Sequence, residues 1–390
     1  MKKIGCVIAY YKNHNNYGTA LQGYATIKVI TDLGYNCRII KYVKQDSLVK
    51  KLKNAPLKLI SGGLDAYMRK RAKKNVAISS TDYAKNIAAR TKANNEWKDR
   101  FMEPHCDVYK GYANLSDGSK KYDLVLVGSD QVWTPLGLYS KLYNLLFVDD
   151  TVPKMSYASS FGVSKIPWWQ KKATARYLNR INALSVREIR AKEIVDSLSN
   201  KKAEVVLDPT LLRTKSEWEE EFVNSPSKVE GDYIFCYLLG KKKETRNEIT
   251  EMAKSLGLKI VVIRHTDEFI ESDEHFGDVP LYDVNPIEFI KLIHDAKYVC
   301  TDSFHCSVFS VIFQRPFITF YRFASSDGNS RNSRIDSLLS LLNLKSRLYA
   351  GNLTNQMQEP IDYGKVAKTL GTLRNHSFEF LKKGLELTNE

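Results

Sequence analysis

Short apolar runs alternate with helix-length amphipathic segments along almost the whole chain. In the first half, the pattern predicts helices at 20–32 and 168–182 and strands at 3–11, 36–43, 122–130, 154–161, 183–188 and 203–209. In the second half, it predicts helices at 244–256, 285–296, 306–313 and 333–344 and strands at 232–239, 259–265, 297–305 and 316–323. Apolar strands separated by helices are typical of parallel sheets covered on both faces. The pattern therefore predicts an α/β fold.

A change of composition at residues 213–230 divides this series in two. The stretch is acidic and polar, and Pro226 and Gly231 mark it as a connection. At 390 residues the chain is too long for one ordinary core. We predict two Rossmann-like domains that face one another across a cleft, the first over 1–212 and the second over 231–350, with 213–230 as linker. A helical tail is expected over 351–390, and a basic, helical insertion over about 43–121.

Composition narrows the class of protein. The apolar content of 43% is that of a folded chain, and no apolar run is long enough to span a bilayer. The six cysteines are scattered without a CxxC pair, which favours a reducing, cytoplasmic setting over a disulfide framework. The spacing of His294, Cys300, His305 and Cys306 fits no common zinc pattern, so no metal site is predicted.

The net charge of +15 is concentrated in one segment. Residues 41–74 hold eleven Lys or Arg against two Asp or Glu, with leucines interleaved. This composition suits an anionic membrane surface or a polyanionic partner, and it equally suits a solvated helical hairpin. No nucleic-acid-binding motif accompanies the charge, so nucleic acid is not an expected partner.

Polar residues gather where predicted strands end, which is where parallel sheets bind ligands. After the first strand, a turn and a helix start could bind an anion or hydroxyl, or could be a plain turn capped by Thr19. After the strand at 122–130, Asp130 could take a proton from a sugar hydroxyl, or could cap a helix. Arg187 could clamp a carboxylate or phosphate, or could pair with a domain acid. The residues of the first two strand ends are Asn16, Tyr17, Gly18, Thr19 and Gln22, and Gly128, Ser129, Asp130 and Gln131.

The stretch TDSFHCS at 301–307 is the most informative of these strand ends. Imidazole has an ordinary pKa of about 6.5, so His305 can give or take a proton near neutral pH, although an isolated His is more often structural. Asp302 and Ser303 precede it, and the apolar helix that follows points its N-terminus at the same place. Arg322 and Arg334 add positive charge downstream, although both could be surface residues.

Together these motifs resemble the polysaccharide pyruvyltransferase family. The resemblance runs in order over roughly residues 4–345, omitting the basic insertion, through NYGTALQGYA, GSDQVW, SYASSFG, SVRE, VLDPTLL, TDSFH and NSRIDSLL. It implies a glycosyltransferase-B type fold. It also implies that the enolpyruvyl unit of phosphoenolpyruvate is transferred to two hydroxyls of one sugar, which gives a cyclic pyruvate ketal.

The resemblance assigns roles to the candidate residues. His305 becomes the acid that protonates the enol carbon, and Asp130 the base for the acceptor. Donor binding falls to Arg187, Ser303, Arg322 and Arg334, and acceptor binding to the remaining strand-end residues, with phosphoenolpyruvate as co-substrate and no other cofactor. Many relatives carry Arg in place of Ser303 and Gly in place of Cys306, so the carboxylate clamp is expected from Arg322, Arg334 or Arg187.

The main hypothesis is a cytoplasmic enzyme that pyruvylates a sugar of a surface-polysaccharide precursor. Its acceptor would be a lipid-diphosphate-linked saccharide, and the basic segment would allow peripheral association with the inner face of the cell membrane. The alternative is a glycosyltransferase-B type enzyme that uses a nucleotide sugar, since a basic site suits a nucleotide diphosphate equally well. A non-catalytic saccharide-binding or membrane-binding protein is a third class.

Overall fold

The computed structural model describes residues 1–10, 12–45, 68, 71, 81–135, 141–266, 269–323 and 332–387. Most of the basic segment 41–74 lies outside these residues, so its expected helical structure and membrane contact remain predictions. Residues 324–331 also lie outside the described residues.

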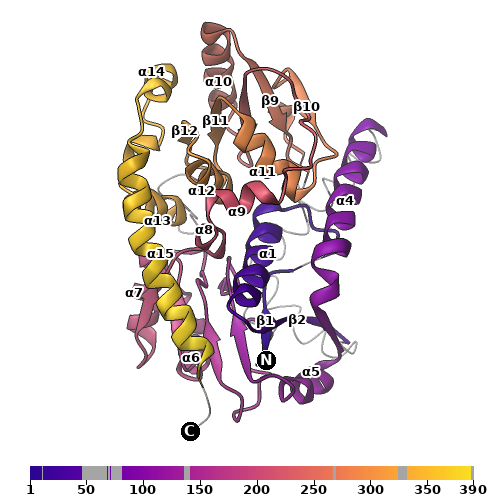
Figure 1. Cartoon of the computed structure of the whole chain (residues 1–390), viewed down its shortest axis with the longest axis vertical. Helices are drawn as coiled ribbons and strands as arrows, with labels where there is room; N and C mark the ends of the chain where they lie inside the picture. Colours follow the sequence, from indigo (N-terminus) through magenta and orange to yellow (C-terminus); the bar gives the residue numbers. More distant parts are fainter. Residues whose placement is uncertain are drawn as a thin grey trace.

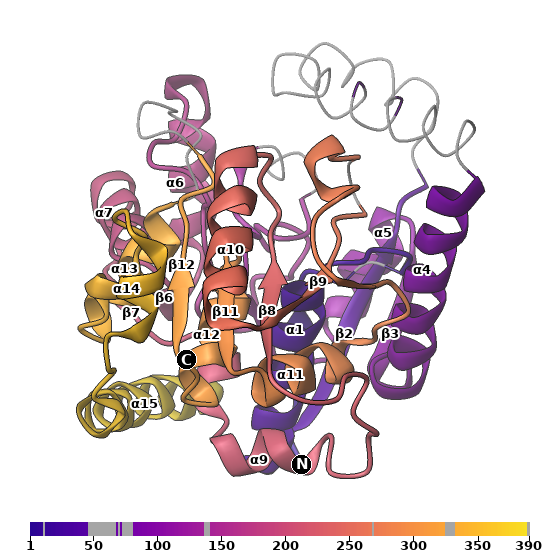
Figure 2. The ribbon, with the colours of Figure 1, turned by 90° about the horizontal axis from the view of Figure 1, so that it is seen from above.

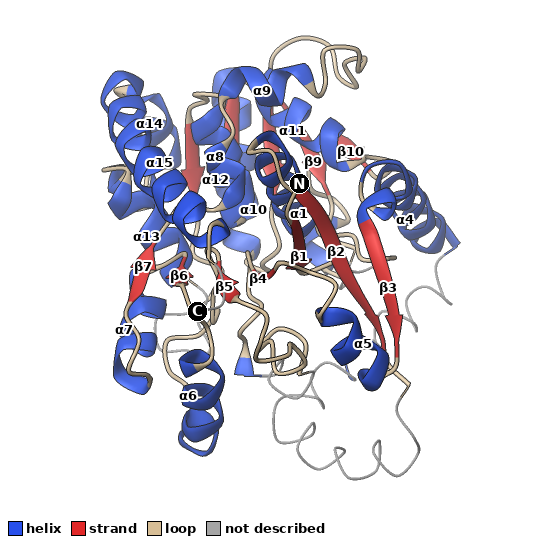
Figure 3. Cartoon of the chain, turned by 60° about the horizontal axis from the view of Figure 1, so that its bottom comes forward, coloured by secondary structure: helices blue, strands red, loops and turns tan. Residues whose placement is uncertain are grey.

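The first domain is built on a parallel five-stranded sheet in the order β3-β2-β1-β4-β5. Its strands are β1 (Lys3–Val7), β2 (Asn36–Val43), β3 (Cys106–Lys110), β4 (Leu124–Val127) and β5 (Lys154–Ser156). Two further parallel strands, β6 (Leu184–Val186) and β7 (Ala203–Val205), continue this layer through single bridges from Met155 and Ser159. Figure 3 shows β1, β2 and β3 side by side along one edge. All four residues of β4 are buried, as expected for a central strand covered on both faces.

The second domain repeats the arrangement. Its parallel sheet has the order β10-β9-β8-β11-β12. The strands are β8 (Tyr233–Tyr237), β9 (Lys259–Ile263), β10 (Val279–Leu281), β11 (Tyr298–Thr301) and β12 (Phe317–Thr319). Both sheets thus have the Rossmann order, and the prediction of two Rossmann-like domains of the glycosyltransferase-B type is confirmed.

Helices connect and cover the strands, and their ends follow local sequence signals. Asn16 accepts a hydrogen bond from the Thr19 amide at the start of α1, Asn285 and Glu288 form a capping box at α11, and Gly257 ends α10 in the left-handed conformation. The described helices of the first domain and linker are α1 (Tyr17–Asp32), α4 (Thr81–Phe101), α5 (Tyr112–Ser119), α6 (Lys171–Asn179), α7 (Ile189–Leu198), α8 (Pro209–Leu212) and α9 (Lys215–Glu220). Those that follow are α10 (Lys243–Leu256), α11 (Pro286–Asp295), α12 (Phe304–Ile312), α13 (Ser333–Leu341), α14 (Leu353–Gln358) and α15 (Tyr363–Leu385).

The structure differs from the sequence pattern at two edge strands. Strand β3 lies within the stretch 43–121, which was expected to be a helical insertion. It was not predicted, because its short sequence CDVYK has no buried apolar run and leaves Val108 half-exposed. Strand β10 was not predicted, because it is three residues long and contains Pro280. Proline is tolerated at a sheet edge, where its missing N–H faces away from the ladder.

The two domains share one continuous hydrophobic core, and α1 lies at their boundary (Figure 1). The Tyr17 ring stacks on Phe289 at 4.5 Å, and its hydroxyl donates to the carbonyl of Val284 at 2.8 Å. From α4, the buried Arg90 donates to the carbonyls of Leu281 and Tyr282. These contacts fix the two domains relative to one another from the side of α1 and α4.

The long helix α15 runs along one side of both domains (Figures 1 and 2). Near its start, Tyr363 donates to the Arg315 carbonyl in the second domain. Further along, the Ser377 hydroxyl accepts from the Leu207 amide at 3.0 Å, and Arg374 donates to the Leu211 carbonyl at 2.9 Å. The segment just before and within α8 is therefore held in place by the tail of the chain.

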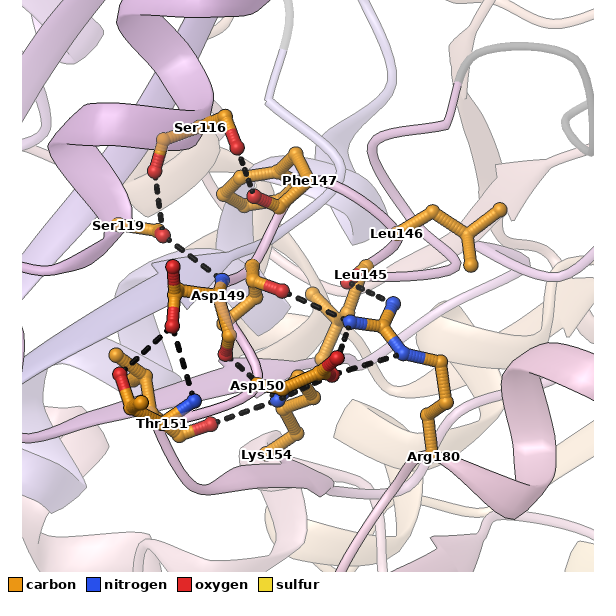
Figure 4. Close-up of polar contacts among 12 residues, drawn as sticks. Ser116, Ser119, Leu145, Leu146, Phe147, Asp149, Asp150, Thr151, Lys154 and Arg180 are labelled. Carbon is orange, nitrogen blue, oxygen red and sulfur yellow. Dashed lines mark hydrogen bonds and ion pairs between the residues drawn. The ribbon is translucent and has the colours of Figure 1, made fainter.

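The connection from β4 to β5 is fastened where it returns to the sheet (Figure 4). The buried Lys154 ammonium donates to the carbonyls of Asp149 and Val152, both at 2.8 Å. Arg180 donates to the carbonyls of Leu145 and Val148. Two cations thus satisfy four backbone acceptors, and they fix the far end of the loop that begins with Gly128.

Three further features bear on the predicted class of protein. All six cysteines are free thiols. No helix within the described residues has the length and apolar character needed to cross a bilayer. Among the same residues, no cluster of three or more His, Cys, Asp or Glu side chains is arranged to hold a metal ion.

Candidate active site

The site follows from the strand order of the two sheets. In each sheet the order reverses beside the first strand, so the loops after β1 and β4, and those after β8 and β11, diverge and leave room for polar side chains. The loops after β1 and β4 carry residues 16–19 and 128–131, and those after β8 and β11 carry residues 238–240 and 302–305. Helix α1 packs against α12, which brings the two sets of loops together.

On the first-domain side, a buried network joins the two loops. The Thr19 hydroxyl donates to Asp130 Oδ2 at 2.9 Å, and Gln22 accepts from the Ser129 amide at 3.2 Å. Gly128 is in a conformation that L side chains rarely adopt, and a Cβ there would lie 1.9 Å from the Tyr157 carbonyl oxygen. This network holds Asp130 in a fixed position at the domain boundary.

On the second-domain side, Asp302 organises the strand ends. Its carboxylate accepts from the amides of Leu239 and Gly240 at 2.8 and 2.6 Å. Arg322 donates to the Asp302 carbonyl oxygen at 3.1 Å. Ser303 is the N-cap of α12, but its side chain makes no capping hydrogen bond, and His305 lies in the first turn of that helix.

The two sides meet at His305 and Gly18. A Cβ built on Gly18 would lie 2.1 Å from His305 Nδ1, so the absence of a side chain allows the imidazole to lie against α1. The other ring nitrogen, Nε2, is 3.6 Å from Asp208 Oδ2. His305 is therefore held between the two domains and is 6% exposed.

Asp208 connects the parts of the site. Its Oδ2 accepts from Arg187 Nη1 at 2.8 Å and from the Ser129 hydroxyl at 3.0 Å, and its Oδ1 accepts from the amide and hydroxyl of Thr210. Burial alone would raise the pKa of this carboxyl, but His305 and Arg187 hold it well below its usual value. Asp208 is thus a permanent anion at neutral pH.

Arg187 lies among three acids and above an aromatic ring. Besides Asp208, its guanidinium is 3.5 Å from Asp130 and 3.7 Å from Glu188, and its Cζ is 4.4 Å from the Phe304 ring centre. Burial alone would lower the pKa of Arg187, but the three acids outweigh burial, so the pKa of Arg187 is raised above its ordinary value. Burial likewise raises the pKa of Asp130, but Arg187, His305 and Arg334 hold it below its usual value. Asp130 is consequently ionised and weakly basic.

Arg334, from the first turn of α13, completes the cationic side of the site. The amide oxygen of Gln131, oriented toward the guanidinium, accepts from Arg334 Nη2 at 2.7 Å. The Cζ atom of Arg334 lies 6.0 Å from the centre of the same Phe304 ring that Arg187 contacts. Burial and repulsion from Arg187 lower the pKa of Arg334 to about 9. An anion bound beside this guanidinium would relieve that repulsion.

Several buried polar atoms of the site have no hydrogen-bond partner among the described residues. They are Arg187 Nε and Nη2, Arg322 Nε, His305 Nε2 and Glu188 Oε2. Such groups are costly to leave unsatisfied, and they commonly mark places where a ligand or water binds. Four of the five atoms belong to potential donors, which suits a ligand rich in acceptor oxygens.

The structure separates the predicted site residues into two groups. His305, Asp130, Arg187 and Arg334 meet at the domain boundary, with Thr19, Gly18 and Gln131 in contact with them. Ser303 and Arg322 lie beside them at the second-domain strand ends, and Asn16 caps α1. Three of the residues predicted to bind the acceptor sugar instead hold the loops and domains together. They are Tyr17, Gln22 and Ser129, which are fully buried and whose polar side-chain atoms have hydrogen-bond partners within the protein.

The family model described as polysaccharide pyruvyl transferase matches residues 16–322, which is well over half of the chain and includes both sets of strand-end loops. The chain belongs to this family. The expected resemblance is thereby confirmed, and membership indicates a pyruvyltransferase that acts in polysaccharide biosynthesis. No curated protein is matched.

Solved structures that resemble this pyruvyltransferase are distant. The UDP-GlcNAc 2-epimerase from Neisseria meningitidis is 11% identical, with a TM-score of 0.46 over 98% of this chain and 100% of that one. A putative UDP-N-acetylglucosamine 2-epimerase from Listeria monocytogenes is 11% identical, with a TM-score of 0.48 over 100% and 98%. The glycotransferase of kitacinnamycin is 10% identical, with a TM-score of 0.49 over 98% and 99%. Identities and TM-scores this low say nothing about the reaction of the pyruvyltransferase.

Sequence reasoning did not assign Asp208, Glu188 or Phe304 to the site. Asp208 belongs to the quoted motif VLDPTLL, but an Asp before Pro at a helix start is an ordinary N-cap. Glu188 enters the sequence analysis only as one of the domain acids with which Arg187 could pair. Phe304 gave no signal, because an apolar residue at a helix start looks like core.

Asp208→Asn should destabilise the pyruvyltransferase. The exchange keeps the size and one acceptor oxygen but removes the nearest countercharge of the buried Arg187. Breaking a buried pair in this way costs about 3–5 kcal/mol, and we expect the lower end, because Asp130 and Glu188 remain. Urea denaturation at pH 7 measures the loss. Asp232→Asn, which removes the exposed pair with Lys297, is the matched control and should cost less than about 1 kcal/mol.

The effect of pH on the parent protein has a definite sign. Because the pKa of Asp208 is depressed on folding, its stabilising contribution is complete above the unfolded value of about 4 and is lost as the pH falls through the folded value. The stability difference between parent and Asp208→Asn should therefore be present at pH 7 and should shrink as the pH falls below about 4. Equal stability of the two proteins at pH 7 would contradict the role given to Asp208.

Proposed function

We propose that this pyruvyltransferase transfers the enolpyruvyl unit of phosphoenolpyruvate to two hydroxyls of one sugar in a surface-polysaccharide precursor. The products are a cyclic pyruvate ketal and inorganic phosphate. Family membership supports the general activity, and the site supports the identity of the donor. Phosphoenolpyruvate is the only co-substrate in this proposal, and no separate cofactor is assigned.

One observation carries the proposal: buried guanidinium nitrogen atoms of Arg187 and Arg322 and the Nε2 atom of His305, all in this site, have no hydrogen-bond partner among the described residues. The Cζ atoms of Arg187 and Arg334 lie 4.4 and 6.0 Å from the centre of the Phe304 ring, and Arg322 lies at the adjoining strand ends. Phosphoenolpyruvate carries a carboxylate and a phosphate on neighbouring atoms. Planar guanidinium groups bind both kinds of oxyanion with paired hydrogen bonds. The N-terminus of α12, with the uncommitted Ser303 hydroxyl, adds a favourable place for one anionic group.

In the proposed reaction, His305 donates a proton to carbon 3 of phosphoenolpyruvate, which becomes the methyl group. The electron pair of the enol double bond forms the new C–H bond, and carbon 2 becomes electrophilic. The first sugar hydroxyl adds to carbon 2 and loses its proton. Phosphate then leaves with the electron pair of its C–O bond, and the second hydroxyl adds and loses its proton. One proton returns to His305 and the other leaves with phosphate.

The acceptor is assigned to the first-domain side of this site. Asp130 lies at the boundary with Thr19 and Gln131, and its carboxylate can receive a hydroxyl proton only at the moment when that hydroxyl adds, because its pKa is low. We propose a lipid-diphosphate-linked saccharide as acceptor. The enzyme would then work in the cytoplasm at the inner face of the membrane, where the basic segment 41–74 would meet anionic lipids.

Phosphoenolpyruvate should raise the Tm of the protein in a concentration-dependent way, because a ligand that binds only the native state stabilises it. Nucleotide sugars should not do so at equal concentration. A shift with a nucleotide sugar and none with phosphoenolpyruvate would favour the glycosyltransferase alternative. Shifts with neither would favour a saccharide-binding protein without this chemistry.

The same titration tests the arginines. Arg334→Lys and Arg322→Lys keep the charge but lose the planar fork, so the apparent affinity for phosphoenolpyruvate should fall about tenfold in each variant. If both Lys variants saturate like the parent, the clamp is not formed by this pair and Arg187 becomes the candidate.

A further inference from the structure

A second surface, outside the active site, presents two tryptophans among unpaired cations. Trp168 is 83% exposed and Trp169 is 37% exposed, in the short helical turn Trp168–Gln170 that precedes α6. Exposed indole rings of this kind are unusual in a protein that buries its other large aromatic side chains well. We call residues 165–176 the tryptophan-lysine face.

The turn is held firmly, so the exposure of Trp168 is not that of a loose loop. Ile166 and Gln170, on either side, are both buried. The Gln170 side chain donates to the carbonyl of Pro135 at 3.1 Å. Helix α6 buries Thr174, Tyr177 and Leu178. The anchored positions therefore point inward, and the tryptophans are left on the outside.

The charge around the two rings has one sign. Between Asp150 and Glu188 the sequence contains seven Lys or Arg and no Asp or Glu. Three of these, Lys154, Arg180 and Arg187, are in ion pairs. The other four are exposed, and none of them forms an ion pair with any described residue: Lys165, Lys171, Lys172 and Arg176.

We propose that the tryptophan-lysine face docks on an anionic phospholipid membrane. Indole rings favour the boundary between headgroups and acyl chains, because one edge is polar and the ring is apolar. Lysines beside them are attracted to the negative surface potential of the cytoplasmic leaflet. Apolar anchors combined with exposed cations are the two signals that stable but reversible membrane association needs.

The position of this face suits an enzyme that receives its acceptor from a membrane. Gln170 contacts Pro135, which lies four residues beyond Gln131 on the loop that carries Asp130. The same loop and α6 line a shallow pocket with Trp133 and Tyr177 in its wall. A membrane at the tryptophan-lysine face would thus lie on the Asp130 side of the first domain. The docking itself does not depend on the identity of the donor.

The test is co-sedimentation of the full-length protein with vesicles of phosphatidylcholine, with and without phosphatidylglycerol. The parent should pellet with the anionic vesicles. Lys171→Glu/Lys172→Glu should lower the partition coefficient by at least about 25-fold, since each lost lysine near an anionic surface contributes about fivefold and each added glutamate is repelled by that surface. Trp168→Ala should weaken it about tenfold by removing an inserted apolar ring. Tm should be unchanged in both variants, because the altered side chains are exposed.

Lys365→Glu/Lys368→Glu is the matched control. These exposed lysines lie in the first half of α15, away from the tryptophan-lysine face, and the double change alters the net charge equally. The control should pellet nearly like the parent. An equal loss in the control and in Lys171→Glu/Lys172→Glu would show a general charge effect and overturn the proposal.

Other occupants of the face would give different results, and each would overturn the proposal. Full pelleting of the Trp168→Ala and Lys171→Glu/Lys172→Glu variants would mean that another segment, such as residues 41–74, binds the membrane. Dissociation of a dimer by Trp168→Ala without lipid, with unchanged vesicle binding, would identify the face as a contact between two copies. Absence of any parental binding to anionic vesicles would exclude membrane docking.

Discussion

His305→Gln should reduce turnover about 10²–10⁴-fold while the protein stays folded and still binds phosphoenolpyruvate. Glutamine keeps polarity and approximate size, but it cannot deliver a proton to carbon 3, and that range is the usual contribution of a positioned acid–base group. The arginines that would hold the donor are untouched by the exchange. Product formation, Tm and the phosphoenolpyruvate-dependent shift in Tm are measured on one preparation.

A purely structural role of His305 predicts the opposite result. His305 is 6% exposed and contacts Gly18 and the Phe304 ring, so it could serve only to fill the space between the domains. The variant would then lose stability and keep its specific activity once folded. A stable and fully active His305→Gln protein would remove His305 from the mechanism. A stable, inactive protein that no longer binds phosphoenolpyruvate would instead place His305 in donor binding.

The fold was predictable from sequence wherever burial is complete. The central strands β4 and β8 are buried at every position and stand out as apolar runs between helices. The edge strands β3 and β10 were missed for the opposite reason, since each leaves at least part of its surface exposed and β10 contains a proline. Hydrophobic periodicity identifies a strand by its buried apolar residues, so it fails for edge strands whose residues are partly exposed.

The site was predictable as a set of strand ends but not as a network. Two strand orders that reverse beside the first strand bring the candidate loops to one place, and sequence alone locates those loops. The pairing partners come from tertiary structure. Asp208 bonds to Ser129, 79 residues away, and its position depends on α8 and on the tail helix α15. No local pattern records such contacts, so the residue at the centre of the network was not singled out.

The same limit explains the residues whose role changed. Tyr17, Gln22 and Ser129 lie in a polar turn, where side chains that bind ligands and side chains that brace loops look alike in sequence. The structure shows that their polar atoms already have partners inside the protein. Arg187 presents the reverse case, because a buried arginine with acid partners still has two nitrogen atoms that lack hydrogen bonds. Unsatisfied buried groups, and not polarity alone, therefore distinguish the candidate binding residues from those that brace the loops.

Gly18→Ala should lower turnover about 10²-fold through a displaced His305. The added methyl group would lie 2.1 Å from Nδ1 and 2.5 Å from Cγ of the His305 imidazole. Non-bonded heavy atoms do not approach a Cβ this closely, so the ring must move. A misplacement of about 1 Å is enough for an effect of this size on a positioned acid. Helix α1 itself tolerates alanine at this position, since alanine is a better helix former than glycine. Gly371→Ala, where a Cβ would meet nothing within 4 Å on α15, is the control and should leave turnover unchanged.

The double variant Gly18→Ala/His305→Gln decides whether the methyl group acts through the imidazole. If it does, the two changes remove the same function, and the double variant should be no slower than His305→Gln alone. If the methyl group instead disturbs the boundary between the domains, it should slow the His305→Gln protein by the same factor as the parent. A multiplicative loss would therefore separate Gly18 from His305, even if both single variants behaved as expected. A fully active Gly18→Ala enzyme would show that the acid does not need the position against α1 that the structure gives it.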